Sequence, residues 1–207
     1  MTELNDYRQE LKERILELAM QEFSLRGLRD IKMDDMAHKL RISKRTLYEI
    51  YADKESLLLE GLQRHRQKME QEMERFAQNE GRNVVDIVVK FFELQMEVES
   101  NVNPQFYADI RKCPRIMEFL ENSKREHDDK ASAFIGRGIK EGLFRGDVDY
   151  KMLTEISHYL LDSVLTHKLY EKYAMKDIMR NFPMILVRGI CTDKGITLLD
   201  KALERHA

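Results

Sequence analysis

Glycine, proline and cysteine are scarce in this 207-residue chain, which contains nine, three and two of them. Few glycines and prolines, together with abundant Leu, Met, Glu, Lys and Arg, favour a mostly helical protein. No apolar run is long enough to span a bilayer, and the polar, acidic start MTELNDYRQE does not resemble a secretory signal. We therefore expect an all-α fold, a cytoplasmic location and no membrane partner.

The two cysteines, Cys113 and Cys191, lie far apart and lack the spacing of a metal-binding motif. Reduced structural thiols are the main interpretation, and a redox sensor is the alternative. No flanking feature predicts the lowered thiol pKa that a redox sensor needs. The sequence also contains no phosphate-binding glycine loop, nucleophile elbow or HExxH motif. We therefore expect neither an enzyme nor a cofactor.

One histidine has a neighbour at a spacing that could hold a metal ion. His158 and Asp162 lie at positions i and i+4 and so share one face of a helix. His167, however, falls on the opposite side of an ideal helix from His158. A hydrogen-bonded or surface His158 is the favoured interpretation, and we expect no metal site.

Positive charge is concentrated in residues 26–45, although the formal net charge of the whole chain is −2. The basic residues of this segment are Arg26, Arg29, Lys32, Lys39, Arg41, Lys44 and Arg45. Asp30, Asp34 and Asp35 oppose them, which leaves a local excess of four positive charges. Phosphate attraction depends on such a local patch rather than on the overall charge. A solvated surface is the plain alternative, so the patch needs support from the helix pattern.

The basic segment lies within a series of short helices separated by tight turns. Helices are expected over residues 7–25, 33–40, 44–50 and 54–79, with apolar residues at three- and four-residue spacing. Gly27 suits the left-handed end of the first helix. Ser43 and Asp53 suit the N-terminal caps of the third and fourth helices. This order predicts a helix-turn-helix followed by a long connecting helix.

The expected third helix has one apolar side and one polar side. With Leu47 facing the core, a rotation of about 100° per residue places Arg45 and Glu49 roughly opposite it. Thr46 and Tyr48 then lie on the flanks. Arg45 can bond guanine O6 and N7, while Glu49 can accept from cytosine N4 or act only by repulsion. The polar side therefore suits the major groove of DNA, and the alternative is a water-facing helix of an ordinary bundle.

The N-terminal pattern resembles the signature of the tetracycline-repressor (TetR) family over about the first 60 residues. The resemblance is carried by Ile15, Ala19, Phe23, Gly27, Met36, Ala37, Ile42, Ser43, Lys44, Thr46, Leu47, Tyr48, Tyr51, Lys54, Glu55 and Leu57. It implies a homodimeric, all-helical transcription regulator with a three-helix DNA-binding domain over residues 1–56. A larger helical domain for ligand binding and dimerisation would follow over residues 57–207.

The resemblance also implies which residues touch the operator. These positions are Ser43, Lys44, Arg45, Thr46, Tyr48, Glu49 and Lys54. Lys32, from the basic segment, is a further DNA-binding candidate. The chain departs from the family pattern at Lys32, where Ser or Thr usually caps the helix, and at Arg45, where Gly is frequent. Glu49 and Ile50 replace aromatic or His residues. These departures leave the expected fold intact but alter the chemistry that meets the operator.

The rest of the chain predicts further helices that carry aromatic and Met residues. They are expected from residue 84 to about 98, from 104, from 114 to about 141, from 149 or 150 to about 170, from 177 to about 190, and from 195 to 205. Gly142 marks a stop, Asp177 is a candidate cap, and Pro183 lies within a helix.

These helices suit a pocket for an apolar or aromatic small-molecule effector that a few polar groups fix. The candidate pocket residues are Phe91, Phe92, Gln95, Met96, Phe106, Tyr107, Ile110, Phe134, Tyr159 and Asp162. The alternative is that aromatic and Met residues at helical spacing form plain core. The identity of the effector does not follow from the sequence.

The expected helices after residue 149 carry more apolar residues than one core face requires. The candidate dimer residues are Leu160, Val164, His167, Phe182, Ile185 and Leu186. Two such helix pairs would form an isologous four-helix interface. A homodimer would place the recognition helices about 34 Å apart, which matches a pseudo-palindromic double-stranded operator.

Other functions stay open at this point. Repression is the commoner outcome in the resembled family, and activation is the alternative. A helical adaptor that binds only protein would lack salt-dependent DNA binding. Such an adaptor would also leave the outward face of Arg45, Thr46 and Tyr48 unexplained.

Overall fold

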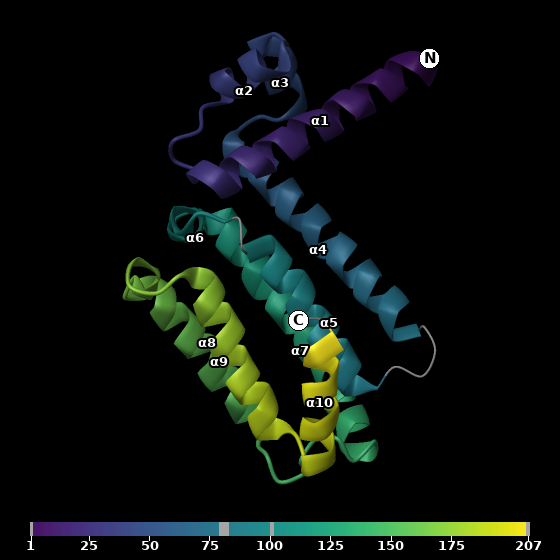
Figure 1. Ribbon diagram of the computed structural model, residues 1–207. Coiled ribbons are helices and arrows are strands. Elements are labelled where there is room, and N and C mark those ends of the chain that lie inside the picture. Colours follow the sequence, from purple (N-terminus) through teal and green to yellow (C-terminus); the bar gives the residue numbers. More distant parts are fainter. Residues whose placement is uncertain (1, 79–82, 100–101, 206–207) are drawn as a thin grey trace. The chain divides into compact units, whose positions relative to one another are not determined.

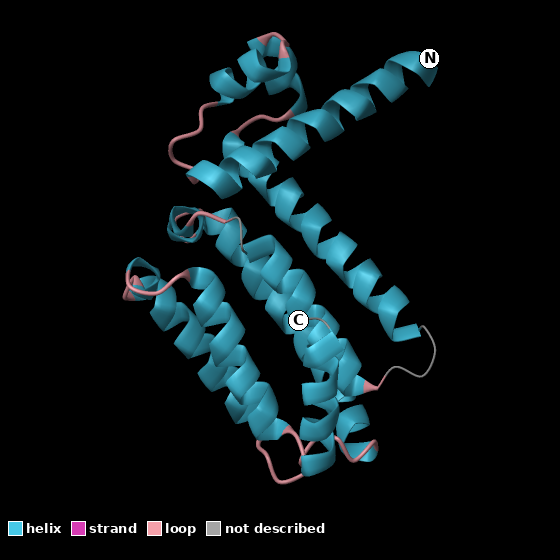
Figure 2. Cartoon of the chain, in the orientation of Figure 1, coloured by secondary structure: helices cyan, strands magenta, loops and turns pink. Residues whose placement is uncertain are grey.

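The computed structural model describes residues 2–78, 83–99 and 102–205. Within these residues every named element is a helix, as Figure 2 shows. The helices are α1 (Thr2–Arg26), α2 (Met33–Leu40), α3 (Lys44–Ile50), α4 (Lys54–Gln78), α5 (Val84–Glu99), α6 (Pro104–Ile110), α7 (Pro114–Lys140), α8 (Tyr150–Thr166), the 3-10 helix η1 (Leu169–Glu171), α9 (Met175–Ile190) and α10 (Asp193–Arg205). The expected all-α fold class is confirmed. None of the helices in the described part has the length and apolar character to cross a membrane.

Several helix ends differ from the expectation. α1 begins at Thr2 rather than near residue 7, since neither glycine nor proline interrupts this segment. α8 ends at Thr166 rather than near residue 170, because Lys168 takes left-handed backbone angles with φ 52°. A short 3-10 turn then replaces the last helical turn that periodicity predicted.

The start of α9 also needs a correction. The helix begins at Met175 after Ala174, so the expectation that Asp177 caps it is wrong. Asp177 lies instead in the first turn, where its backbone N–H donates to the Ala174 carbonyl (2.9 Å) and its charge favours the helix dipole. The last helix, α10, begins at Asp193, two residues before the expected start at Gly195.

The chain forms two compact units, and the first comprises Met1–Lys68 and Asn101–Ser123. In this unit α1 contacts both α2 and α6, and α2 contacts α3 (Figure 1). Its core is a cluster of buried side chains in which Ile15, Phe23 and Leu47 are fully buried. α2 and α3 thus share one core with α6, a segment that follows them by more than fifty residues. The expected boundary of the DNA-binding domain at residue 56 stays a prediction.

The second unit comprises Met69–Ser100 and Lys124–Ala207. Here α5 contacts α9 and α10, and Val84 and Val85 of α5 are fully buried in a second cluster of apolar side chains. The turn after α7 uses Gly142 at φ 70°, as the sequence predicted for this stop. Phe144 then forms an isolated antiparallel bridge with Cys191, which joins this turn to the end of α9.

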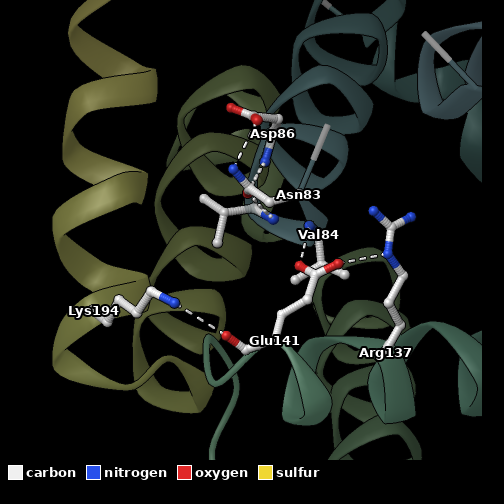
Figure 3. A network of polar contacts seen from close by, with 7 residues as sticks. Asn83, Val84, Asp86, Arg137, Glu141 and Lys194 are labelled. Atoms are coloured by element: carbon white, nitrogen blue, oxygen red, sulfur yellow. Dashed lines mark hydrogen bonds and ion pairs between the residues drawn. The ribbon is translucent and has the colours of Figure 1, made fainter. Parts of the chain in front are cut away.

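A polar network fixes the first turn of α5 to α7 and α10 (Figure 3). Glu141 Oε2 accepts from the Val84 amide (3.1 Å), and Glu141 Oε1 accepts from Arg137 Nε (2.6 Å). Lys194 Nζ donates to the Glu141 carbonyl (3.2 Å). Asn83 Oδ1 caps the same helix by accepting from two backbone amides of its first turn (2.9 and 3.1 Å). The network therefore supplies partners for amides at a helix start that no helical carbonyl can reach.

Candidate nucleic-acid interface

The turn between α2 and α3 is built without a glycine. Arg41 caps α2 at φ 56° and ψ 40°, in the left-handed region. The Ile42 amide donates to the Ala37 carbonyl (3.0 Å), and the Ile42 side chain packs against the first core. The sequence predicted a tight turn here but not a left-handed arginine, because arginine has no intrinsic preference for that region.

Ser43 caps α3, as the sequence predicted. Its Oγ accepts from the Thr46 amide (3.0 Å) and lies 2.8 Å from Thr46 Oγ1. At the other end of the helix the Tyr51 amide donates to the Leu47 carbonyl (2.9 Å). The hydroxyls of Ser43 and Thr46 thus serve the helix start, and the Thr46 methyl group is the part suited to contact a thymine methyl.

The two sides of α3 differ sharply in exposure. Leu47 is fully buried in the first core, whereas the side chains of Arg45 and Glu49 are 88% and 56% exposed. Tyr48 is 48% exposed on the flank. The predicted division into an apolar inner side and a polar outer side is confirmed. The contacts of the outer side with DNA stay a prediction.

Two ion pairs organise the charges of this outer side. Lys44 Nζ lies 2.5 Å from Asp34 Oδ2, and the hydrogen bond to this carboxylate raises the pKa of Lys44. Arg45 Nε lies 2.8 Å from Glu49 Oε1, and the hydrogen bond to Glu49 raises the pKa of Arg45. Both pairs are exposed, so they contribute little to stability and act mainly by fixing side-chain positions.

The two remaining lysine candidates, Lys32 and Lys54, differ from each other. Lys32 is exposed at the N-cap of α2, and its side chain makes no capping hydrogen bond. Lys54 Nζ donates to the carbonyls of Leu28 (2.5 Å) and Ile31 (2.7 Å), and burial lowers the pKa of Lys54. Lys54 therefore ties the loop before α2 to the start of α4. The ammonium has three N–H donors, so one is left for a phosphate, and the DNA contact of Lys54 stays a prediction.

Sequence reasoning missed a buried carboxylate that holds the same loop. Asp109 in α6 is only 4% exposed, and its oxygens accept from the Arg29 amide (3.0 Å) and from Gln105 Nε2 (2.8 Å). A Cβ at Gly27 would lie 3.1 Å from Asp109 Oδ2, so the glycine permits this approach. Asp109 follows Arg29 by 80 residues, and no local pattern could have paired them.

The candidate pocket residues are divided between the two compact units. Phe106, Tyr107 and Ile110 lie in the first unit, whereas Phe91, Phe92, Gln95, Met96, Phe134, Tyr159 and Asp162 lie in the second. Phe106 and Ile110 are buried parts of the first core. Phe92 and Phe134 pack against the second core, and Tyr159 is exposed. The residues of the second set therefore lie within a single unit.

The candidate dimer residues lie at or near the surface of the second unit. Leu160, His167 and Ile185 are exposed, and Val164, Phe182 and Leu186 are half-buried. Met152, Ile156 and Tyr159 of α8 are exposed at a spacing that places them on one side of the helix together with Leu160. The surface of α8 thus carries an apolar stripe.

A cleft of about 400 Å³ opens beside the network of Figure 3. It is lined by Ala77, Asn83, Arg137, Glu141, Leu143, Lys194 and Leu198. None of the pocket residues predicted from the sequence lines it. Among the residues that the structure describes, no group of three or more His, Cys, Asp or Glu side chains could hold a metal ion.

Two short helices joined by a tight turn form a helix-turn-helix, the motif that defines one class of DNA-binding proteins. In this class the second helix packs one side on the core and presents its polar side outward. Residues 15–60 match the family model described as "Bacterial regulatory proteins, tetR family". The match to this family of regulatory proteins covers the C-terminal half of α1, all of α2 and α3, and the start of α4. None of the curated proteins matches the chain by sequence.

Solved structures of regulators share the fold over most of the chain. A protein described as a transcriptional regulator from Saccharomonospora viridis, in complex with choline, is 23% identical with a TM-score of 0.71, over 89% of this chain and 99% of that chain. A TetR-family regulator from Agrobacterium tumefaciens is 14% identical with a TM-score of 0.70, over 89% and 100%. The ketosteroid regulator KstR2 of Mycobacterium tuberculosis is 21% identical with a TM-score of 0.59, over 88% and 95%. At these identities the similarity establishes the fold, with its larger helical C-terminal part.

Proposed function

We propose that the chain is a ligand-responsive repressor that binds a pseudo-palindromic operator as a homodimer. The observation that carries the proposal is α3, whose single buried side chain, Leu47, leaves the opposite side open to a DNA groove. Arg45 supplies donors for guanine, and the Tyr48 hydroxyl suits a phosphate. Lys32 and Lys44 supply positive charge near the backbone of the duplex.

Selection of binding sites from random double-stranded DNA tests this function. The purified full chain should enrich an inverted repeat whose half-sites lie one helical turn, or a multiple of it, apart. Affinity for the enriched site should fall steeply as salt rises, because phosphate contacts release counterions. Failure to enrich any sequence at low salt would reject the DNA-binding proposal and favour a protein-binding adaptor.

Arg45→Ala is expected to weaken operator binding about 5- to 150-fold and to relax the preference at one base pair, because a bidentate guanine contact is lost. Binding to random DNA should change much less. Gel-shift titrations of both DNAs at several salt concentrations measure the effect. Lys32→Ala is the control: it should weaken both DNAs alike and reduce the salt slope by about one. Equal losses on both DNAs for Arg45→Ala would contradict its role in base recognition.

The proposed effector is an apolar or aromatic small molecule that binds the second unit. In α5 the rings of Phe91 and Phe92 lie edge to face, 5.7 Å apart, and Gln95 and Met96 follow on the next turn. Tyr159 and Asp162 of α8, with Phe134 of α7, complete the candidate set. The choline complex of the Saccharomonospora viridis protein supports a small-molecule input of some kind.

Release of the selected operator by candidate molecules tests the effector class. Aromatic acids, steroids and choline should be compared in the same gel-shift assay, and steroids or aromatic molecules are expected to release the DNA. Release by choline alone would reject the apolar chemistry and leave the ligand response in place. Release by none of them at saturating concentrations would argue for a regulator that does not respond to these molecules.

Ile185→Glu is expected to raise the Kd of the proposed homodimer about 100-fold or more, since an isologous interface buries the new charge twice. Ile185 of α9 is 67% exposed, and Tyr159 of α8 is 69% exposed. A monomer would leave this apolar surface in contact with water, at a cost in free energy. Light scattering at micromolar concentration measures the mass. Leu25→Glu on α1, at a leucine that is 52% exposed, should leave the mass unchanged. A monomeric unmodified chain would contradict the proposal.

A further inference from the structure

The ion pair of Arg45 and Glu49 occupies the centre of the exposed side of α3. The residues are one helical turn apart, and Arg45 Nε donates to Glu49 Oε1 at 2.8 Å. The Arg45 side chain is 88% exposed, although it takes part in this ion pair. Leu47 is buried on the opposite side of the helix, so the pair points away from the core.

This geometry uses one particular nitrogen of the arginine. A guanidinium carries five N–H groups, one on Nε and four on the two terminal nitrogens. Since Glu49 engages Nε, the two terminal nitrogens stay available as a fork that matches guanine O6 and N7. The carboxylate thus leaves the base-reading end of the side chain open.

Holding the side chain also matters for binding. A long exposed arginine samples many rotamers in solution, and binding a base fixes one of them at an entropic cost. An acceptor one turn away restricts the rotamers before DNA arrives. The same acceptor disfavours rotamers that turn Arg45 toward a phosphate. Such rotamers would break the pair and leave the Glu49 carboxylate without its partner near the negative backbone of the DNA.

We propose that Glu49 is a positioning residue that sets the base preference of Arg45 by holding its Nε. The inference rests on the DNA-binding function proposed above and assigns a specificity role within that interface. Glu49 need not touch a base in this arrangement. Its carboxylate acts through the orientation of the arginine.

The neighbouring charges separate this role from a general effect of charge. Lys44 is paired with Asp34 of α2 rather than with Glu49. Arg8 of α1 donates from Nη2 to the backbone carbonyl of Glu49 (3.5 Å), a contact that does not use the carboxylate. Replacing the Glu49 side chain therefore leaves both of these contacts in place. Asp34→Ala removes a negative charge from the same surface without changing the Arg45 pair.

A double-mutant cycle on the selected operator tests the proposal. The cycle compares four proteins: the full chain, Glu49→Ala, Arg45→Ala and the double variant. Each is titrated with the operator and with the three operator variants that change the base pair at which Arg45→Ala relaxes the preference. Glu49→Ala should reduce discrimination at this base pair about three- to tenfold. In the Arg45→Ala background the same change should have no effect on discrimination. Asp34→Ala should strengthen binding to all sequences alike and leave the preference unchanged.

The outcomes distinguish the failure of this inference from the failure of the proposed function. If the unmodified chain selects an operator and Glu49→Ala shifts all affinities equally, Glu49 acts by charge alone and the inference is wrong. If Glu49→Ala alters discrimination equally with and without Arg45, Glu49 reads a base itself and the inference is also wrong. If the unmodified chain selects no operator, both proposals fail. Circular dichroism should show unchanged folding, because the pair is exposed.

Discussion

Leu47→Ala is expected to lower the free energy of unfolding by about 2–5 kcal/mol and to abolish specific operator binding. Leu47 is fully buried in the first core and is the one buried side chain of α3. Truncation leaves a cavity beneath a seven-residue helix that has no other buried anchor. The helix then loses its fixed orientation, and the exposed side chains of Arg45 and Tyr48 lose theirs. Urea denaturation and gel-shift titration measure the two effects.

Leu25→Ala is the matched control for this substitution. Leu25 belongs to α1 in the same unit but is 52% exposed, so its truncation should change the free energy of unfolding by less than about 0.5 kcal/mol. Operator affinity should also stay within about twofold, because surface substitutions away from special features have effects of about 0.5 kcal/mol or less. If Leu47→Ala behaved like Leu25→Ala, α3 would not be held by its buried leucine, and the proposed interface would lose its foundation.

Gly195→Ala is expected to destabilise the second unit by about 3 kcal/mol or more, as an overpacked contact with no room to relax. A Cβ at this position would lie 2.2 Å from the Leu143 carbonyl oxygen. That oxygen accepts from the Thr192 amide (3.0 Å), so moving it away would break a hydrogen bond. The first turn of α10 would have to separate from the turn after α7. Thermal denaturation followed by circular dichroism measures the loss.

Gly136→Ala provides the opposite case within the same unit. Gly136 lies inside α7, and apart from its neighbours in the chain and the backbone of its own helix no heavy atom lies within 4 Å of the position that its Cβ would take. Alanine should therefore stabilise the protein by about 0.5–1 kcal/mol through its higher helix propensity. Similar changes in stability at Gly195 and Gly136 would contradict the close approach of α10 to Leu143.

The helices of the N-terminal unit were predictable because their signals are local. The bounds of α2 and α3 agree with the expectation, and Ser43 forms the predicted cap. Caps, apolar spacing and breakers act over a few residues, so the sequence displays them directly. The expectation failed at α9, where Asp177 suits a cap and a first turn equally well. An acidic residue near the start of a helix therefore fits either position, and the neighbouring residues determine which one it takes.

The partners of polar groups were not predictable in this way. Lys54 was predicted only as a phosphate contact, and its bonds to two carbonyls of the loop before α2 were not expected. Asp109 showed no pattern of its own, yet it holds that loop through the Arg29 amide. The predicted pocket residues were grouped by residue type, but Phe106 and Phe91 belong to different compact units. Such assignments depend on contacts between distant segments.

The amino-acid sequence by itself determined the all-helical class, the helix-turn-helix and the outward side of α3, because helix periodicity and caps are properties of adjacent residues. The tertiary structure alone decided which side chains are available. It directed Lys54 and Asp109 inward to backbone groups of the loop before α2, which lies far from both residues in the sequence. Buried backbone groups must be satisfied by whatever the fold brings near them, and that proximity exists only after the chain has folded.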